Sequence, residues 1–345
     1  MKFGVTVPTY GTWGDPAVIR DGVQAAEDLG FDTVWFGDHI VIPSYAAHLS
    51  PPNWLEPLSC AFVCAGATKL IRFGVDVLVL PYRNPVWLSQ LVASADQLCG
   101  GRLTIATGVG YLKGEFEALG APAYEQRGAV SDEHLEVLTT LWESDGPVSF
   151  EGTWVNFADI HAAPRPAQRP MPLWVGGNIG AARRRAALHG NGWHPLFPNA
   201  DEYRSGRAEI LDARAAAGLS AEFSFSYSCP PTRLVLTDAE WPDTVGYGTA
   251  EVPDDYRYAP PFPTATNGRP RFIGTPGDLI DDIRELEAAG VEHLALRFSI
   301  GVPAEDLAHL TQQMERFMEH VAPAFPDSSR AHDAVTFDPL WRDLR

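Results

Sequence analysis

Short β-rich segments alternate with amphipathic helical segments along the chain of 345 residues, and this alternation constrains the fold more than any other feature. Parallel strands need helical connections of this kind, because a tight turn can join only antiparallel neighbours. The strand-like segments are residues 2–8, 32–36, 71–80, 102–108, 172–177, 191–196, 222–228 and 293–299. Eight strands, each followed by a helix, predict an α/β fold, a single (β/α)8 TIM barrel, over residues 1–320.

Local signals mark where several helices begin. Asp15 and Asn84 each stand directly before a proline, the arrangement of an N-cap followed by Pro at the first helical position. Thr275 precedes Pro276 and lies three residues before Asp278, which is the spacing of a capping box. In the helix after Asn84 we expect five apolar residues to share the buried face: Leu88, Leu91, Val92, Ala95 and Leu98.

Two segments interrupt the alternation, and a third stretch follows the last helix. Residues 148–157 (VSFEGTWVNF) predict a small hairpin, whereas residues 229–271 are rich in Pro, Gly and Tyr and show no regular period. A structureless segment of that length within a barrel is expected to be functional. We therefore expect 229–271 to be an insertion over the barrel mouth after the seventh strand, and 321–345 to be a C-terminal tail.

Composition and charge argue against several classes of function. The formal net charge of −18 is unsuited to a nucleic-acid partner, which requires a clustered basic face. No segment approaches the ~18 apolar residues of a membrane helix, and the first residues lack a signal-peptide pattern. Cys60 and Cys64 lie in an apolar run that favours core packing over a metal site. We expect a cytoplasmic protein with no membrane, nucleic-acid or metal partner.

Two polar residues come directly after the second predicted strand, at the end of a barrel where enzymes of this fold place their chemistry. The His39 imidazole could hydrogen-bond or exchange a proton with a substrate or a cofactor ring, unless it is simply a surface loop histidine. Asp38 is a second candidate catalytic residue, although an Asp after a strand is commonly a turn or capping residue.

The segment after the fourth strand contains small and hydrogen-bonding residues: Thr107, Gly108, Gly110 and Tyr111. Glycines let the backbone approach a flat ring closely, and Thr107 could donate a hydrogen bond to it. Ordinary turn chemistry is the alternative explanation for each of these residues. We expect Glu115 and Glu117, farther along, to lie on a solvated helix face.

Gly176, Gly177 and Asn178 follow the fifth strand and open a helix. Free N–H groups and the dipole at a helix start favour a phosphate, and Gly180 and Ala181 would add backbone donors. The arginines at 183–185 either meet an anionic ligand there or are simply exposed. Candidate walls of a binding pocket are Trp54, Trp193 and His194.

Four local sequences occur together in one order: GFDTVWFGDH (30–39), FGVDVLVLPYRNP (73–85), GGRLTIATGVGYLKGEFEALG (100–120) and PLWVGGN (172–178). Together they resemble the luciferase-like flavin and deazaflavin oxidoreductases. The resemblance is greatest to the branch that uses the 5-deazaflavin coenzyme F420. It spans roughly residues 1–228 and 272–320 and leaves the insertion and the tail unmatched.

The resemblance implies a cofactor at the C-terminal strand ends, with its ring supported by a cis non-prolyl peptide in a bulge of the third strand. The matching bond is Asp76–Val77. It also implies that His39 lies beside the reactive face of the ring and that Gly177–Ala181 anchors a phosphate. In FMN-using bacterial luciferases an arginine after the fourth strand clamps the flavin phosphate. The matching residue here is Val109, which favours coenzyme F420 over FMN.

We therefore expect an oxidoreductase that transfers a hydride between coenzyme F420 and a small organic substrate. The main alternative is a monooxygenase that uses oxygen and reduced FMN from a separate reductase. A barrel that binds a flavin without turning it over is another. An aldolase-like barrel would need a lysine at a strand end, and Lys2, Lys69 and Lys113 are not placed there. The resemblance also implies a homodimer packed through the helices after strands two and three.

Overall fold

Eight parallel strands form a closed barrel in the computed structural model, which describes residues 1–47, 50–242, 262–299 and 306–326. The barrel strands are β1 (Lys2–Thr6), β2 (Thr33–Phe36), β3 (Arg72–Val79), β4 (Leu103–Gly108), β7 (Leu173–Gly176), β8 (Gly192–His194), β9 (Ser224–Pro231) and β12 (His293–Arg297). Their order around the barrel follows the chain, and β12 closes it against β1. The predicted (β/α)8 barrel is confirmed.

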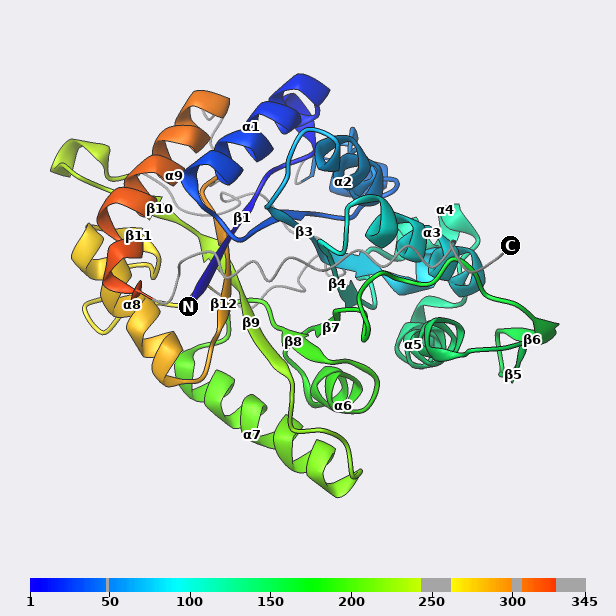
Figure 1. Cartoon of the computed structure of the whole chain (residues 1–345). Coiled ribbons are helices and arrows are strands. Elements are labelled where there is room, and N and C mark those ends of the chain that lie inside the picture. The colour runs from blue at the N-terminus through cyan, green and yellow to red at the C-terminus, as the bar shows by residue number, and fades with distance from the viewer. Residues whose placement is uncertain (48–49, 243–261, 300–305, 327–345) are drawn as a thin grey trace.

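Helices surround the strands (Figure 1). They are α1 (Pro16–Leu29), α2 (Pro57–Ala65), α3 (Pro85–Leu98), α4 (Lys113–Leu119), α5 (Arg127–Glu143), α6 (Gly180–His189), α7 (Ala200–Ala216), α8 (Pro276–Ala288) and α9 (Leu307–His320). The predicted caps form: the side chains of Asp15 and Asn84 accept first-turn N–H groups, and Thr275 and Asp278 make a reciprocal capping box. Among the described residues, no helix is both long and apolar enough to cross a membrane.

The predicted hairpin is present as β5 (Val148–Glu151) paired with β6 (Asn156–Ile160), and it lies at the outer edge of the molecule beside α5 (Figure 1). Val155 packs against α5, where the Glu133 carboxylate accepts the N–H groups of residues 153–155. The barrel strand β9 runs to Pro231 and so takes in the first residues of the expected insertion 229–271. Within that segment β10 (Arg233–Leu234) pairs with β11 (Ile273–Gly274), which lies just beyond it. Residues 243–261 of that segment and 327–345 of the tail lie outside the described residues.

Two tryptophans fill the middle of the barrel. Trp35 and Trp174 point inward with ring centroids 5.6 Å apart. Glycines on neighbouring strands make room for them, since a Cβ on Gly74 would lie 2.2 Å from the Trp35 ring and one on Gly192 would lie 2.1 Å from the Trp174 ring. The interior of the barrel is therefore a packed core. A substrate or cofactor must bind outside this core, at the carboxyl ends of the strands.

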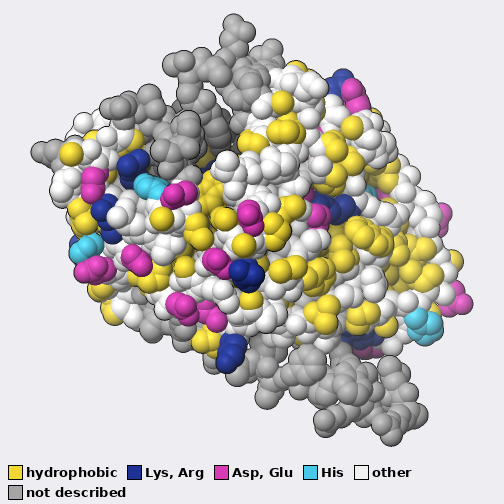
Figure 2. Space-filling model, turned by 90° about the horizontal axis from the view of Figure 1, so that it is seen from above, with side chains coloured by type: hydrophobic (Ala, Val, Ile, Leu, Met, Phe, Trp, Pro, Cys, Tyr) yellow, Lys and Arg dark blue, Asp and Glu magenta, His cyan; other side chains and the backbone are white. Residues whose placement is uncertain are grey.

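The expected buried face of α3 is only partly correct. Leu88, Val92 and Ala95 are buried, but the Leu98 side chain is 75% exposed. The helix carries apolar residues on two faces, and its second face includes Trp87, which is 56% exposed. Figure 2 views the side of the molecule on which α1 and α2 lie, and it shows hydrophobic side chains gathered over a broad area of the surface.

Candidate active site at the barrel mouth

The carboxyl ends of the strands form a floor that is polar on one half and nearly bare on the other. Alternation along each strand directs inward one residue at or near the end of each of β1, β12, β9 and β8. These residues are Thr6, Arg297, Ser228 and His194. The adjoining strands β7 and β4 end in Gly176 and Gly108 at the same level. The glycine half leaves room for the side chain of Val77, on which a flat molecule could lie with its edge toward the polar half.

Asp76 links the two halves of this floor. Its carboxylate accepts hydrogen bonds from His194 Nε2 at 3.1 Å and from the Ser228 hydroxyl at 2.9 Å. Burial alone would raise the pKa of Asp76, but the charge and hydrogen bond of His194, together with Arg297 and Ser228, hold that pKa at about 2. Asp76 is therefore ionised at neutral pH, and His194 is oriented by it on one side and by Ser226 on the other.

The Asp76–Val77 peptide bond is cis, as predicted. The pairing of β3 with β4 shifts its register between Val75 and Leu78, so the predicted bulge in the third strand is also confirmed. The Val77 side chain lies against the two glycines of the floor. A Cβ added to Gly108 would approach it to 2.5 Å, and one added to Gly176 to 2.9 Å. Glycine at both positions is what lets Val77 lie across the mouth as an apolar shelf.

His39 lies between two side chains that follow β4. Its Nδ1 is 3.0 Å from Glu115 Oε2, and its Nε2 is 2.9 Å from the Tyr111 hydroxyl. The Trp54 ring packs edge-on against it at 4.8 Å, so Trp54 borders the same site, as the sequence suggested. His39 is thus not a free surface histidine but a member of a hydrogen-bonded group.

Glu115 corrects one prediction. It was expected on a solvated helix face, but its side chain is 0% exposed, whereas Glu117 is exposed as expected. The Glu115 carboxylate accepts the N–H groups of Ile40 and Val41 and the Tyr82 hydroxyl in addition to its contact with His39. These donors come from the loops after β2 and β3, which close over α4 only in the folded protein.

Sequence reasoning therefore missed Glu115 and Tyr82 as site residues. One signal could have found Glu115: it shares a helical face with Leu112 and Leu119, three and four residues away, and Leu112 is fully buried. No comparable signal marks Tyr82, which reaches Glu115 across 33 positions of sequence.

Asp38 precedes His39 in the chain, but its side chain forms an ion pair with Arg83. The two side chains form a bidentate ion pair with both N–O distances at 2.7 Å, and Asp38 also accepts the N–H of Val79. The side chains of Asp38 and Arg83 are buried. The pair therefore ties the loop after β2 to the end of β3.

The other predicted residues after β4 are placed differently from one another. The Thr107 hydroxyl donates to the carbonyl of Trp174 at 3.0 Å, so its proton is already used within the barrel. Gly110 has a φ of +78°, which a residue with a side chain rarely adopts. Tyr111 faces His39, and its carbonyl accepts a hydrogen bond from Tyr124.

The segment after β7 opens α6 as predicted. Gly177 has a φ of +103° and turns the chain into the helix. The Asn178 amide is occupied on both sides by the backbone of Leu196. No side chain caps the helix start at Ile179, and the following Gly180 and Ala181 are exposed. The N–H groups of Gly180 and Ala181 therefore face a ligand at the helix start, whereas that of Ala182 already bonds the carbonyl of Ile179.

The arginines of α6 do not converge on its start. Arg183 pairs with Glu209 and the carbonyl of Asn178, and Arg185 pairs with Asp132. Arg184 is exposed. Trp193, expected as a pocket wall, is buried under α7 and donates its indole N–H to the carbonyl of Gly177, so it supports the α6 turn from behind.

All four cysteines are free and buried, as core packing requires. Burial raises the pKa of Cys60 to about 12 and that of Cys64 to about 11, so both stay protonated thiols. Within the described residues, no three His, Cys, Asp or Glu side chains are grouped so as to hold a metal ion.

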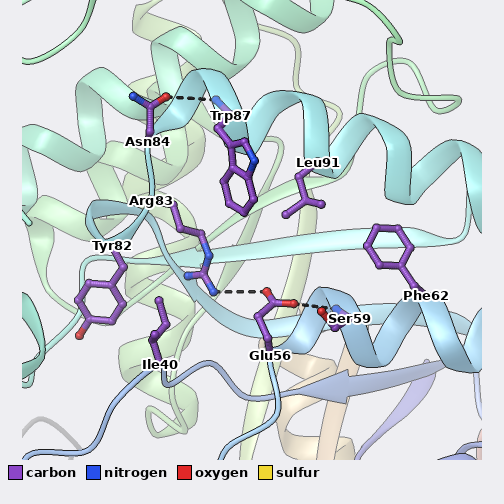
Figure 3. A pocket seen from close by; sticks show the side chains of 9 residues that line it. All are labelled: Ile40, Glu56, Ser59, Phe62, Tyr82, Arg83, Asn84, Trp87 and Leu91. Carbon is purple, nitrogen blue, oxygen red and sulfur yellow. Dashed lines mark hydrogen bonds and ion pairs between the residues drawn. The ribbon is translucent and has the colours of Figure 1, made fainter. Parts of the chain in front are cut away.

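A pocket, called the hollow below, lies behind this site on the outside of the barrel between α2 and α3 (Figure 3). Its volume is about 440 Å³, and its walls include Phe62, Trp87 and Leu91. Arg83 and Tyr82 line its inner side, and Figure 3 shows the Tyr82 hydroxyl turned away from Arg83. The inner wall of this hollow is therefore made of the residues that hold Asp38 and Glu115.

Relatives of known activity resemble the chain along much of its length. It is 26% identical to the FMNH2-dependent dimethylsulfone monooxygenase of Pseudomonas putida over 338 residues, covering 88% of this chain and 86% of that protein. It is 29% identical to the F420-dependent glucose-6-phosphate dehydrogenase of Amycolatopsis mediterranei over 171 residues, covering 49% of this chain and 50% of that one.

Solved structures confirm the luciferase-like type of barrel. A monooxygenase from Streptomyces bottropensis superposes with a TM-score of 0.75 at 23% identity, covering 94% of this chain and 99% of that one. An F420-dependent secondary alcohol dehydrogenase superposes with a TM-score of 0.74 at 19% identity, covering 94% and 98%. The family model described as luciferase-like monooxygenase matches residues 1–239, and the chain therefore belongs to this family of oxidoreductases.

Proposed function

We propose that this protein is an oxidoreductase that transfers a hydride between coenzyme F420 and a small organic substrate at the carboxyl end of the barrel. Membership of the family makes it a flavin- or deazaflavin-dependent enzyme. The deazaflavin and the hydride transfer are the specific parts of the proposal.

The Val77 shelf is the observation that carries the proposal. A planar tricyclic ring needs an apolar support, and Val77, which fits against Gly108 and Gly176, supplies it. A Cβ at either glycine would displace the shelf. On the polar half of the floor, Arg297 is 21% exposed and can donate hydrogen bonds to the edge of a ring on the shelf. His194 is buried, with both nitrogens bonded to Ser226 and Asp76, and supports this half from below.

One feature favours coenzyme F420 over FMN. Val109 occupies the position at which FMN-using luciferases carry a phosphate-clamping arginine, so that contact is missing here. The N–H groups of Gly180 and Ala181 and the dipole of α6 would then hold the phosphate of either cofactor.

The side chains around the mouth then divide their tasks. The bound cofactor supplies the redox chemistry, because no protein side chain accepts or donates a hydride. His39 orients the substrate and exchanges a proton with it. Asp38 acts through Arg83 as a positioning residue, since its oxygens are occupied by that ion pair and by Val79.

The test is binding followed by turnover. The purified protein is titrated with coenzyme F420 and with FMN, each oxidised and reduced, and binding is followed by absorbance and fluorescence. Micromolar binding of coenzyme F420 with weak or absent FMN binding is expected. Micromolar FMN binding without F420 binding would overturn the choice of cofactor. The spectrum of any cofactor that co-purifies provides an independent reading.

A monooxygenase that uses oxygen and reduced FMN is the second candidate. It is favoured by the resemblance to the dimethylsulfone monooxygenase, which extends over 88% of this chain. Such an enzyme would depend on a separate reductase, and oxygen consumption with reduced FMN would reveal it. A cofactor carrier without catalysis predicts tight binding and no turnover with any alcohol, aldehyde or thioether tested.

A further inference from the structure

Glu115 is a buried carboxylate whose every oxygen has a donor. Oε1 accepts the N–H of Ile40 at 2.7 Å and that of Val41 at 3.2 Å, and Oε2 accepts the Tyr82 hydroxyl at 2.8 Å and lies 3.0 Å from His39 Nδ1. Four donors on a fully buried side chain form a built anion site, and such a site fixes the orientation of the carboxylate. Burial and the adjacent carboxylate raise the pKa of Tyr82 well above its ordinary value, so Tyr82 stays a donor.

This arrangement determines which nitrogen of His39 carries the proton. An ionised carboxylate only accepts hydrogen bonds, so Nδ1 must be protonated where it faces Glu115. In the neutral imidazole Nε2 then holds the lone pair, and the Tyr111 hydroxyl at 2.9 Å donates to it. A proton taken up by His39 therefore goes to Nε2, and the resulting positive charge lies next to the Glu115 carboxylate.

We propose that Glu115 is the positioning residue of the catalytic histidine: it holds His39 in the Nδ1–H tautomer and makes Nε2, with Tyr111 against it, the atom that exchanges the proton. This rests on the proposed function for its role in turnover. Glu115 itself forms no covalent bond and gives up no proton; it only accepts a hydrogen bond from His39. In the exchange, the Tyr111 hydroxyl gives its proton to Nε2 of His39 while the Tyr111 oxygen takes a proton from the substrate side, and the reverse transfer follows the same route.

The charged and titratable groups around the pair are few and have assigned partners. They are Asp38 and Arg83, bound to each other, Tyr82 on Glu115, and Tyr111 and Tyr124, of which Tyr124 donates to the Tyr111 carbonyl. Among the described side chains, Glu115 is thus the carboxylate in contact with His39, while Asp38 is neutralised by Arg83.

The first test uses four variants and no cofactor. Histidine-labelled protein is titrated by nitrogen NMR, with His39→Gln to identify the signal of His39. We expect the Nδ1–H tautomer in the wild type. Glu115→Gln removes the negative charge, so the fixed tautomer should be lost and the His39 titration should move to lower pH by about one unit or more. Tyr82→Phe removes a donor and leaves Glu115 a stronger base, so the titration should move upward.

Glu117→Gln, on the exposed side of the same helix, is the matched control and should change neither quantity. A wild-type tautomer and titration in Glu115→Gln would overturn the proposal. If Glu115→Gln does not fold, the proposal stands or falls on Tyr82→Phe, and an unmoved His39 titration there would overturn it.

The second test is kinetic. In Glu115→Gln the kcat should fall at least tenfold with little change in KM, and the pH profile of kcat should shift in the direction of the NMR titration. Because the NMR experiment contains neither cofactor nor substrate, a correct tautomer with no F420-dependent turnover would reject the proposed function and leave the role of Glu115 intact. Unchanged kcat and pH profile in a folded variant would reject the role instead.

Discussion

At the scale of the residue, the site depends on what is absent as much as on what is present. Gly108 and Gly176 carry no side chain where the end of β3 crosses the mouth, and Val77 occupies the space. Neither glycine has a positive φ at the barrel end, so an alanine there fails by collision and not by backbone strain.

Gly108→Ala tests the shelf directly. Its Cβ would lie 2.5 Å from Val77 Cγ2, so Val77 must shift or turn. We expect a loss of about 1–3 kcal/mol in the free energy of unfolding, as for other overpacked sites, and at least tenfold weaker cofactor binding. Denaturant unfolding and the absorbance titration measure the two quantities.

Gly146→Ala is the matched control, because nothing lies within 4 Å of its Cβ position. It should leave stability and binding close to those of the wild type. Full cofactor affinity in a folded Gly108→Ala protein would contradict a ring site on the Val77 shelf.

At the scale of the element, a negative charge at the start of α6 should affect helix stability and ligand binding in opposite ways. A carboxylate in the first turn of a helix stabilises it, because the N-terminal end of the dipole is positive. The same carboxylate repels an anionic ligand at that end. A substitution there therefore moves the two properties in opposite directions.

Ala181→Glu uses this opposition, since Ala181 is exposed in the first turn of α6. We expect an unchanged or slightly raised melting temperature and about tenfold weaker binding of a cofactor with an anionic tail. Ala181→Gln has nearly the same size without the charge and should bind normally. Equal affinity for both variants, measured in low salt, would argue against a phosphate at this helix.

At the scale of the whole molecule, the exposed apolar side of α2 and α3 calls for a partner. Val63 on α2 is 64% exposed and Trp87 on α3 is 56% exposed, and Trp87 also lines the hollow between these helices. A contiguous exposed apolar patch on a protein surface commonly marks an interaction site. We propose that it is the homodimer interface expected from the resemblance.

The prediction is a dimer of the 37.6 kDa chain in solution, measured by light scattering at micromolar concentration. Trp87→Glu should shift the protein toward the monomer, because the interface would have to bury an unpaired charge. Leu219→Glu, at an exposed apolar position beyond the end of α7, should remain dimeric. A monomeric wild type would reject this interface. Because Arg83 and Tyr82 line the same hollow, the monomer should also show reduced activity.

The amino-acid sequence by itself determined the succession of strands and helices and most of their ends. Caps such as Asp15, Asn84 and Thr275 act within one helical turn, and strand and helix periods are properties of short windows. The fold could be predicted from them because eight consecutive strand–helix units commonly close into a (β/α)8 barrel. The cis bond at Asp76–Val77 was predicted from the family resemblance and not from these local rules.

Only the tertiary structure decided which polar residues work together. Glu115 looked like a solvated helix residue because its partners are far away in sequence, and His39 stands 76 positions before it. Asp38 meets Arg83 over 45 positions, and Leu98 is exposed because α3 turns its other face to the barrel. Local periodicity cannot encode such contacts. These contacts form because strands that are distant in sequence end at the same mouth of the barrel. Buried polar groups there are stable only when they are hydrogen-bonded.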